Sequence, residues 1–238
     1  MKIKAIFFDL DGTLLPMDQD TFIGAYLGGL CKLLAPKGYD PQAVGAALWK
    51  STGAMMKNDG RISNEQVFWN SFAAILGDGV RNEMDLLAEF YAGDFQKVKN
   101  VCGYTPRSRE LIDRLKQTEL RVILATSPLF PTVATESRIR WAGLEPTDFE
   151  YVTTYENSKF CKPNPVYYVD LCKKLGLVPN DVLMVGNDVG DDMVAESVGM
   201  RVFLLTDDLI NKSGRDINDF RHGGFDELNA YIEEIINE

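Results

Sequence analysis

The chain has 238 residues, of which 45% are hydrophobic, and its formal net charge is −10 at pH 7. This size and composition predict one α/β domain with room for a small inserted subdomain. The negative charge argues against a nucleic-acid partner, because that binding needs many Lys and Arg side chains to neutralise phosphates. Neither a signal peptide nor an apolar run of roughly 20 residues is present, which predicts a cytoplasmic protein that binds no membrane.

The cysteines and the single histidine exclude several kinds of site. The four cysteines show no CxxC pair and no density typical of a disulfide scaffold, so reduced thiols are expected. His222 is the only histidine and stands in a polar Arg-His-Gly-Gly segment. A histidine metal cluster or a Ser/His triad is therefore hard to build.

Short apolar runs alternate with helical patterns along most of the chain. Runs without polar alternation are typical of parallel strands that are buried on both faces. The expected strands are Ala5–Leu10, Val122–Ala125, Tyr151–Thr153, Val182–Val185 and Val202–Leu205. The expected helices between and after them are Arg107–Gln117, Pro131–Trp141, Pro165–Leu175, Asp192–Val198 and Asp226–Ile236. This alternation predicts a doubly wound, Rossmann-like parallel sheet.

One long stretch, from about Thr21 to Lys99, shows helical patterns only. Within it, Ser63 and Gln66 have the spacing of a capping box that opens a helix. We therefore expect an α/β core of residues 1–19 and 101–238, with a helical cap subdomain of residues 20–100 inserted after the first strand. The connections contain Pro, and the second also contains Gly, as short linkers do. A cap in this position is expected to close as a lid and to set substrate choice.

The first expected strand ends in two aspartates separated by one residue, Asp9 and Asp11, followed by Gly12 and Thr13. In an extended backbone, alternate side chains point to the same side, so the two carboxylates are expected to point in the same general direction. Gly12 lets the chain turn sharply beside them. Ligands of open parallel sheets bind beyond the carboxyl ends of the strands, which makes this pair a candidate site.

Three more polar clusters follow in the chain. Thr126 and Ser127 end the second expected strand, and Lys162 lies just ahead of an expected helix. The last cluster follows the strand Val182–Val185 and contains Gly186, Asn187, Asp188, Asp191 and Asp192. Several acidic side chains at a strand end suit Mg²⁺, which prefers oxygen ligands.

In order and spacing, the four clusters resemble the motifs of the haloacid dehalogenase superfamily. Asp9 to Thr13 matches the Asp-x-Asp-x-Thr pattern of its first motif. The helical cap between the first and second motifs resembles the branch that contains phosphoglycolate phosphatase and beta-phosphoglucomutase. The resemblance runs from Ile3 to about Leu205. It departs at Asn187, because the fourth motif in its common form, Gly-Asp-x-x-x-Asp, has an aspartate there.

The resemblance implies a Mg²⁺-dependent phosphatase that hydrolyses a small-molecule phosphate monoester through a phosphoaspartate. Asp9 is then the nucleophile and a metal ligand. Asp11 is the general acid and base, and its backbone carbonyl is a metal ligand. Thr126, Ser127 and Lys162 are implied to bind the phosphoryl group, with Lys162 also among the catalytic residues.

The fourth cluster leaves two assignments open. Counting back from the following helix favours Asn187 with Asp191, whereas charge favours Asp188 with Asp192. We prefer Asp188 as the third metal ligand, since a carboxylate binds a hard cation better than an amide does.

Three other functions compete with the phosphatase. A dehalogenase of the same superfamily needs neither a metal nor a second acid two residues after the nucleophile, so Asp11 favours phosphoryl transfer. A phosphomutase shares the core chemistry, and a non-catalytic phosphate-binding protein would tolerate Asn187. The expected partner is a small phosphorylated substrate, and a monomer or a small homo-oligomer is expected.

Overall fold

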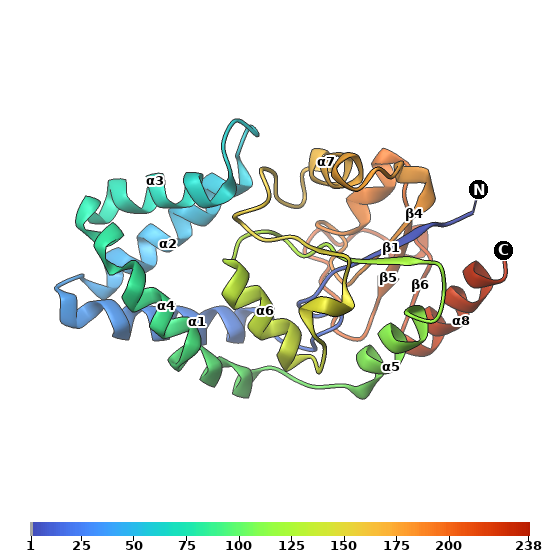
Figure 1. Cartoon of the computed structure of the whole chain (residues 1–238), viewed down its shortest axis with the longest axis horizontal. Helices are drawn as coiled ribbons and strands as arrows, with labels where there is room; N and C mark the ends of the chain where they lie inside the picture. The colour runs from blue at the N-terminus through green and yellow to red at the C-terminus, as the bar shows by residue number, and fades with distance from the viewer. Residues whose placement is uncertain (1) are drawn as a thin grey trace.

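The computed structural model describes residues 2–238 and has one six-stranded sheet with helices on both faces (Figure 1). The strand order is β3-β2-β1-β4-β5-β6, and all pairings between neighbours are parallel. The strands are β1 Ala5–Phe8, β2 Arg121–Leu124, β3 Tyr151–Val152, β4 Val182–Gly186, β5 Arg201–Leu205 and β6 His222–Gly223. The predicted doubly wound α/β fold is confirmed.

The helices divide into a group near the N-terminus and a group that alternates with the strands. The first group is α1 Gln19–Leu34, α2 Pro41–Met56, α3 Asn64–Leu76 and α4 Met84–Ala92, with 3₁₀ helices at Ala35–Lys37, Asp78–Glu83 and Asp94–Val101. The second is α5 Pro106–Leu115, α6 Thr132–Trp141, α7 Pro165–Leu175 and α8 Phe225–Ile236, with 3₁₀ helices at Pro146–Asp148, Pro179–Asp181, Met193–Val198 and Ile217–Asp219.

Strand β1 lies in the middle of the sheet, and its side chains enter two separate apolar layers. Ile6 and Phe8 belong to the hydrophobic cluster that includes α5 and α8 residues, whereas Ala5 and Phe7 belong to the cluster that includes α7 residues. Because both faces of the strand are buried, its sequence is apolar without alternation. Phe8 pairs with Leu124 of β2 and with Val185 of β4, so the carboxyl ends of these three strands lie at one edge.

The helical stretch after β1 forms the separate lobe on the left of Figure 1. The capping box predicted at its third helix is present: the N–H of Gln66 donates to Ser63 Oγ at 3.2 Å, and the N–H of Ser63 donates to Gln66 Oε1 at 3.1 Å. The two connections to the core lie side by side, since the N–H of Gly103 donates to the Pro16 carbonyl at 2.7 Å. We propose that residues 20–100 act as the cap.

The structure corrects two of the predicted elements and adds one strand. β1 ends at Phe8, two residues earlier than expected. The helix expected at Asp192–Val198 is a 3₁₀ helix over Met193–Val198, and Gly199, at φ +95°, ends it. Strand β6 at His222–Gly223 was not predicted; it pairs with the edge of β5 but has no apolar run to indicate it.

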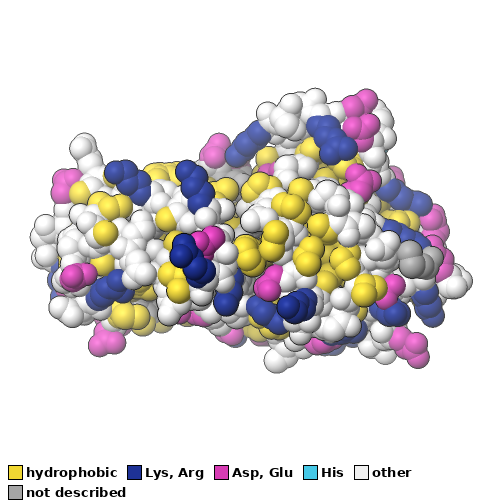
Figure 2. All heavy atoms as spheres, turned by 90° about the horizontal axis from the view of Figure 1, so that it is seen from above, with side chains coloured by type: hydrophobic (Ala, Val, Ile, Leu, Met, Phe, Trp, Pro, Cys, Tyr) yellow, Lys and Arg dark blue, Asp and Glu magenta, His cyan; other side chains and the backbone are white. Residues whose placement is uncertain are grey.

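Charged side chains of both signs lie on the face of the molecule drawn in Figure 2. Lys and Arg side chains are scattered singly among Asp and Glu over the face drawn in Figure 2. Among residues 2–238, no helix is both long enough and apolar enough to cross a membrane.

Candidate active site

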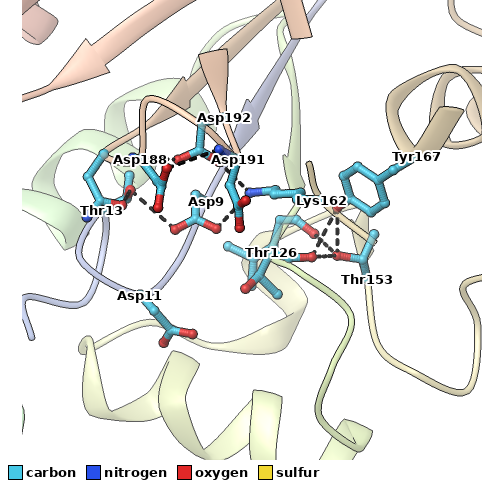
Figure 3. A network of polar contacts seen from close by, with 12 residues as sticks. Asp9, Asp11, Thr13, Thr126, Thr153, Lys162, Tyr167, Asp188, Asp191 and Asp192 are labelled. Atoms are coloured by element: carbon cyan, nitrogen blue, oxygen red, sulfur yellow. Dashed lines mark hydrogen bonds and ion pairs between the residues drawn. The ribbon is translucent and has the colours of Figure 1, made fainter. Parts of the chain in front are cut away.

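Asp9 is the first residue after β1 and lies at the centre of the carboxyl edge of the sheet (Figure 3). Its N–H donates to the Val185 carbonyl at 2.9 Å, which fixes its backbone against β4. Its side chain accepts a hydrogen bond from Lys162 Nζ at 2.8 Å, and Thr13 Oγ1 lies 3.4 Å from its other oxygen. The residue is only 8% exposed. Asp9 therefore presents a fixed and largely dehydrated carboxylate.

Lys162 comes from the loop that precedes α7 and is almost fully buried. Its ammonium donates to Asp9 Oδ1 at 2.8 Å and to Asp192 Oδ1 at 2.6 Å, so it links two of the predicted clusters. Burial alone would lower the pKa of Lys162, but the Asp192 and Asp9 carboxylates raise it well above its ordinary value. The ammonium is thus held in its charged form between two acids.

Two glycines allow the fourth cluster to pack against the first. A Cβ on Gly186 would lie 2.1 Å from Asp192 Oδ2, so the carboxylate reaches Lys162 only because position 186 has no side chain. A Cβ on Gly12, where φ is +81°, would lie 2.2 Å from Asn187 Nδ2. Both contacts are specific reasons for glycine at these strand ends.

Asn187 and Asp192 contact different parts of the site. Asn187 accepts a hydrogen bond from Thr13 Oγ1 at 3.1 Å and donates to the Asp208 carbonyl at 2.6 Å, which ties it to the turn that follows Asp9. Asp192 contacts Lys162 directly. Asn187 thus supports the turn that carries Asp11 and Thr13, whereas Asp192 shares the Lys162 ammonium with Asp9.

Asp188 and Asp191 lie beside Asp9 in Figure 3. Asp188 Oδ1 accepts the N–H groups of Gly190 at 2.7 Å and Asp191 at 3.0 Å, which orients the side chain. Burial raises the pKa of Asp191 to about 6 and that of Asp192 to about 7, although Lys162 lowers both. Asp9, Asp188, Asp191 and Asp192 gather at this edge, and Lys162 pairs directly with only two of them, Asp9 and Asp192. This concentration of carboxylates favours a bound cation.

Asp11 departs from the expected geometry. Because β1 ends at Phe8, strand alternation does not extend to Asp11, and Figure 3 shows its carboxylate turned away from Asp9. Asp11 Oδ2 instead pairs with Arg138 Nη1 from α6. Asp11 Oδ1 is buried and has no hydrogen-bond partner among residues 2–238. Burial raises the pKa of Asp11, although Arg138 lowers it, so the group holds a proton more readily than an exposed aspartate.

The loop after β2 supplies hydroxyl groups to the same edge. Thr126 is buried, and its carbonyl accepts from Thr153 Oγ1 at 2.6 Å and from the Tyr167 hydroxyl at 3.0 Å. Those bonds hold the loop in place. The neighbouring Ser127 Oγ is buried and has no hydrogen-bond partner among residues 2–238. It is therefore a donor available to a ligand.

The helical lobe reaches these loops through Asn64, the first residue of α3. Asn64 is fully buried, and its Nδ2 lies 3.4 Å from the Pro128 carbonyl and 3.2 Å from Cys161 Sγ. Pro128 follows Ser127, and Cys161 precedes Lys162. One side chain of the lobe thus touches both loops that carry predicted phosphate ligands.

The structure brings most of the predicted site residues together. Asp9, Lys162 and Asp188 meet at the carboxyl edge, with Thr126 and Ser127 in the adjoining loop, whereas Asp11 lies to one side. Arg138, the ion-pair partner of Asp11, was not predicted. Its neighbour Arg140 is exposed, and no feature of the sequence separates the two.

The donor set fits a hard divalent cation. Among residues 2–238, no three His, Cys, Asp or Glu side chains are already arranged to hold an ion. Mg²⁺, however, usually takes one or two carboxylates and completes its shell with waters and substrate oxygens. Asp9, Asp188 and the Asp11 carbonyl offer oxygen donors only, and the concentration of carboxylates described above suits such an ion.

The parallel sheet, its acidic carboxyl edge and the inserted helical lobe define a class of α/β proteins with an aspartate-rich site at the strand ends. The chain belongs to the haloacid dehalogenase-like hydrolase family, whose model matches residues 3–199.

The sequence identity between this chain and individual relatives is low. Phosphoglycolate phosphatase of Haemophilus influenzae is 25% identical, with 86% of each chain covered. The chloroplast protein SUPPRESSOR OF QUENCHING 1 of Arabidopsis thaliana is 21% identical over 98% of this chain, which spans only 22% of that protein's length. The structure of a HAD phosphatase from Thermococcus onnurineus superposes with a TM-score of 0.60 at 22% identity, covering 97% of this chain and 98% of that one. The structures of a 2-haloacid dehalogenase from Pseudomonas syringae and a beta-phosphoglucomutase from Clostridium difficile have the same fold.

Proposed function

We propose that this chain is a Mg²⁺-dependent phosphatase that hydrolyses a small-molecule phosphate monoester through a phosphoaspartate at Asp9. The observation that carries the proposal is the buried carboxylate of Asp9, fixed by Lys162 at 2.8 Å and surrounded by further carboxylates. A bound Mg²⁺ would neutralise these carboxylates and the phosphate, so that an anionic nucleophile can approach an anionic substrate. The names of the curated relatives, two of which are phosphoglycolate phosphatases, support the same class of reaction.

In the proposed reaction an Asp9 carboxylate oxygen attacks phosphorus, and the bond from phosphorus to the ester oxygen breaks. Asp11 donates a proton to the departing oxygen and then accepts one from the water that attacks the phosphoaspartate, which releases inorganic phosphate and restores Asp9. Arg138 holds Asp11 Oδ2, which leaves the unpartnered Oδ1 to carry the proton. The raised pKa of Asp11 suits the acid role.

Lys162, Thr126 and Ser127 are proposed to bind the phosphoryl oxygens. The ammonium lies against the nucleophile, so a phosphoryl group transferred to Asp9 would contact it. The available Ser127 hydroxyl supports this role. These contacts to the phosphoryl group are the same for every phosphate monoester, so they cannot select among substrates. We propose that the cap, which touches both loops through Asn64, closes over the site and selects the substrate.

A screen of phosphate monoesters with and without Mg²⁺ tests the proposed function. We expect inorganic phosphate release to require Mg²⁺, because Asp9, Asp188, Asp191 and Asp192 would otherwise repel the substrate dianion. Release of halide from 2-haloacids without any phosphatase activity would identify a dehalogenase instead. Interconversion of sugar phosphates without net phosphate release would identify a phosphomutase.

The metal assignment predicts a ranking among three variants. Asp188→Ala is expected to raise the Mg²⁺ concentration for half-maximal activity by at least about tenfold, since it removes a proposed ligand. Asp191→Asn and Asn187→Ala are expected to raise it less. Asn187→Ala should instead lower the unfolding temperature, because it breaks the bonds to Thr13 and Asp208.

Magnesium titrations of activity, with thermal unfolding as the second readout, check this ranking. A larger increase in the Mg²⁺ requirement for Asn187→Ala or Asp191→Asn than for Asp188→Ala would favour the alternative pairing of Asn187 with Asp191.

A further inference from the structure

A cavity of about 250 Å³ lies between the cap helices and the loop that follows β2. Most of its wall is aromatic or aliphatic. All four cap helices contribute to it, with Tyr26, Trp49, Trp69 and Ala88 among their side chains, and Leu129 and Phe130 line it from the loop. Trp49, Met84 and Val133 are exposed and mark where the cavity opens to solvent.

The wall contains no Lys, Arg, His, Asp or Glu side chain. A carboxylate or a second phosphate placed in it would lose its hydration without gaining a charged partner, which costs far more than burying an apolar group. A polyhydroxylated sugar would find few partners there, because the polar atoms of the wall side chains are limited to hydroxyl and indole groups such as those of Thr52 and Trp69. The lining therefore selects apolar matter, and an apolar cavity of about 150 Å³ already accepts one benzene ring.

One residue of the cavity wall, Phe130, links the cavity to Asp11 through Arg138. Leu129 follows Thr126 by three residues, so their Cα atoms are at most about 11 Å apart. The ring of Phe130 stacks on the Arg138 guanidinium, with the Cζ atom 4.3 Å from the ring centroid, and Arg138 pairs with Asp11. Phe130 also packs edge to face with Tyr26 of the cap at 5.2 Å.

We propose that this cavity binds the alcohol portion of the substrate, and that the substrates are phosphate monoesters of aromatic or branched aliphatic alcohols. The inference rests on the proposed phosphatase function and on Asp11 protonating the leaving oxygen. With phosphorus at Asp9 and the leaving oxygen towards Asp11, the rest of the substrate extends to the side on which Arg138, Phe130 and the cavity wall lie.

A pair of esters with leaving groups of similar acidity tests the substrate class. Naphthylmethyl phosphate and glycerol phosphate both release alkyl alcohols, so leaving-group chemistry does not decide between them. We expect kcat/KM for naphthylmethyl phosphate to be higher by at least about a hundredfold, as burial of an aromatic body predicts. Equal values, or a preference for glycerol phosphate, would overturn the proposal while leaving the phosphatase function intact.

A matched pair of variants tests whether the cavity causes the preference for naphthylmethyl phosphate. Ala88 lines the cavity on α4 and Ala74 lies on α3 outside it; both are exposed, so a larger side chain threatens the fold at neither position. Ala88→Trp is expected to lower the ratio of the two kcat/KM values by about tenfold, since it obstructs the cavity. Ala74→Trp should leave the ratio within about twofold of the wild type. Equal ratios in the two variants would place the selecting surface elsewhere.

A binding measurement with the alcohol alone separates the proposed phosphatase function from the proposed role of the cavity. Naphthylmethanol is expected to bind the full chain and to change the fluorescence of Trp69 and Trp49, which line the cavity, and Ala88→Trp should weaken its binding about tenfold. If no ester is hydrolysed yet naphthylmethanol binds and Ala88→Trp weakens it, the phosphatase function fails and the apolar site stands. If esters are hydrolysed but the alcohol does not bind, the cavity assignment is wrong.

Discussion

Replacing Asp9 by Asn is expected to reduce kcat by at least about ten-thousand-fold, because the amide cannot form the phosphoaspartate. The fold should survive, since Asn is close to Asp in shape and Lys162 keeps its 2.6 Å contact with Asp192. The measurement is phosphate release from the best ester found in the Mg²⁺ screen, with circular dichroism and thermal unfolding as checks on the fold.

Two controls make the Asp9 result specific. Asp20→Asn makes the same chemical change at an exposed residue of α1 and should retain the wild-type rate. A single turnover in heavy-oxygen water identifies the bond that breaks: water that attacks phosphorus leaves the label in phosphate, whereas water that attacks a carboxyl carbon, as in a dehalogenase ester, leaves it in Asp9. Wild-type-like turnover by Asp9→Asn would eliminate Asp9 as the nucleophile.

The sheet could be predicted because its strands are continuous apolar runs interrupted by polar strand ends. Val182–Val185 was expected as a strand and is one, with Gly186 added. The order of the β and α patterns then places the strand ends at one edge, which is why Asp9, Thr126 and Asn187 could be expected to lie near one another. Strand β6 was not predicted, because a two-residue strand at the edge of a sheet needs no apolar pattern.

The contacts between clusters could not be predicted in the same way. Arg138 reaches Asp11 across 127 positions of sequence, and only the packing of α6 decides that it, and not Arg140, points inward. The direction of Asp11 depended on where β1 ends, and sequence periodicity locates element ends least well. The two assignments left open for the fourth cluster, Asn187 with Asp191 or Asp188 with Asp192, depend on the turn after Gly186, in which Asp188 accepts two backbone N–H groups.

Replacing Lys162 by Met is expected to reduce kcat by about a thousandfold, because the variant loses the charged donor that would face the transferred phosphoryl group. The metal-free variant should also be less stable by about 3–5 kcal/mol, since Asp9 and Asp192 would remain buried without their ammonium partner. Lys159→Met, three residues earlier in the same loop and exposed, is the matched control and should change neither quantity appreciably.

A double variant separates the structural role of Lys162 from its catalytic role. Adding Asp192→Asn to Lys162→Met removes one unpaired buried charge, so the free energy of unfolding should recover by about 1–3 kcal/mol. The turnover should not recover, because no cationic donor faces the phosphoryl group in either variant. Denaturant unfolding and phosphate release measure the two effects separately. Activity that returned together with stability would mean that Lys162 only neutralises its two carboxylates, and the phosphoryl contact would then have to come from Thr126 and Ser127.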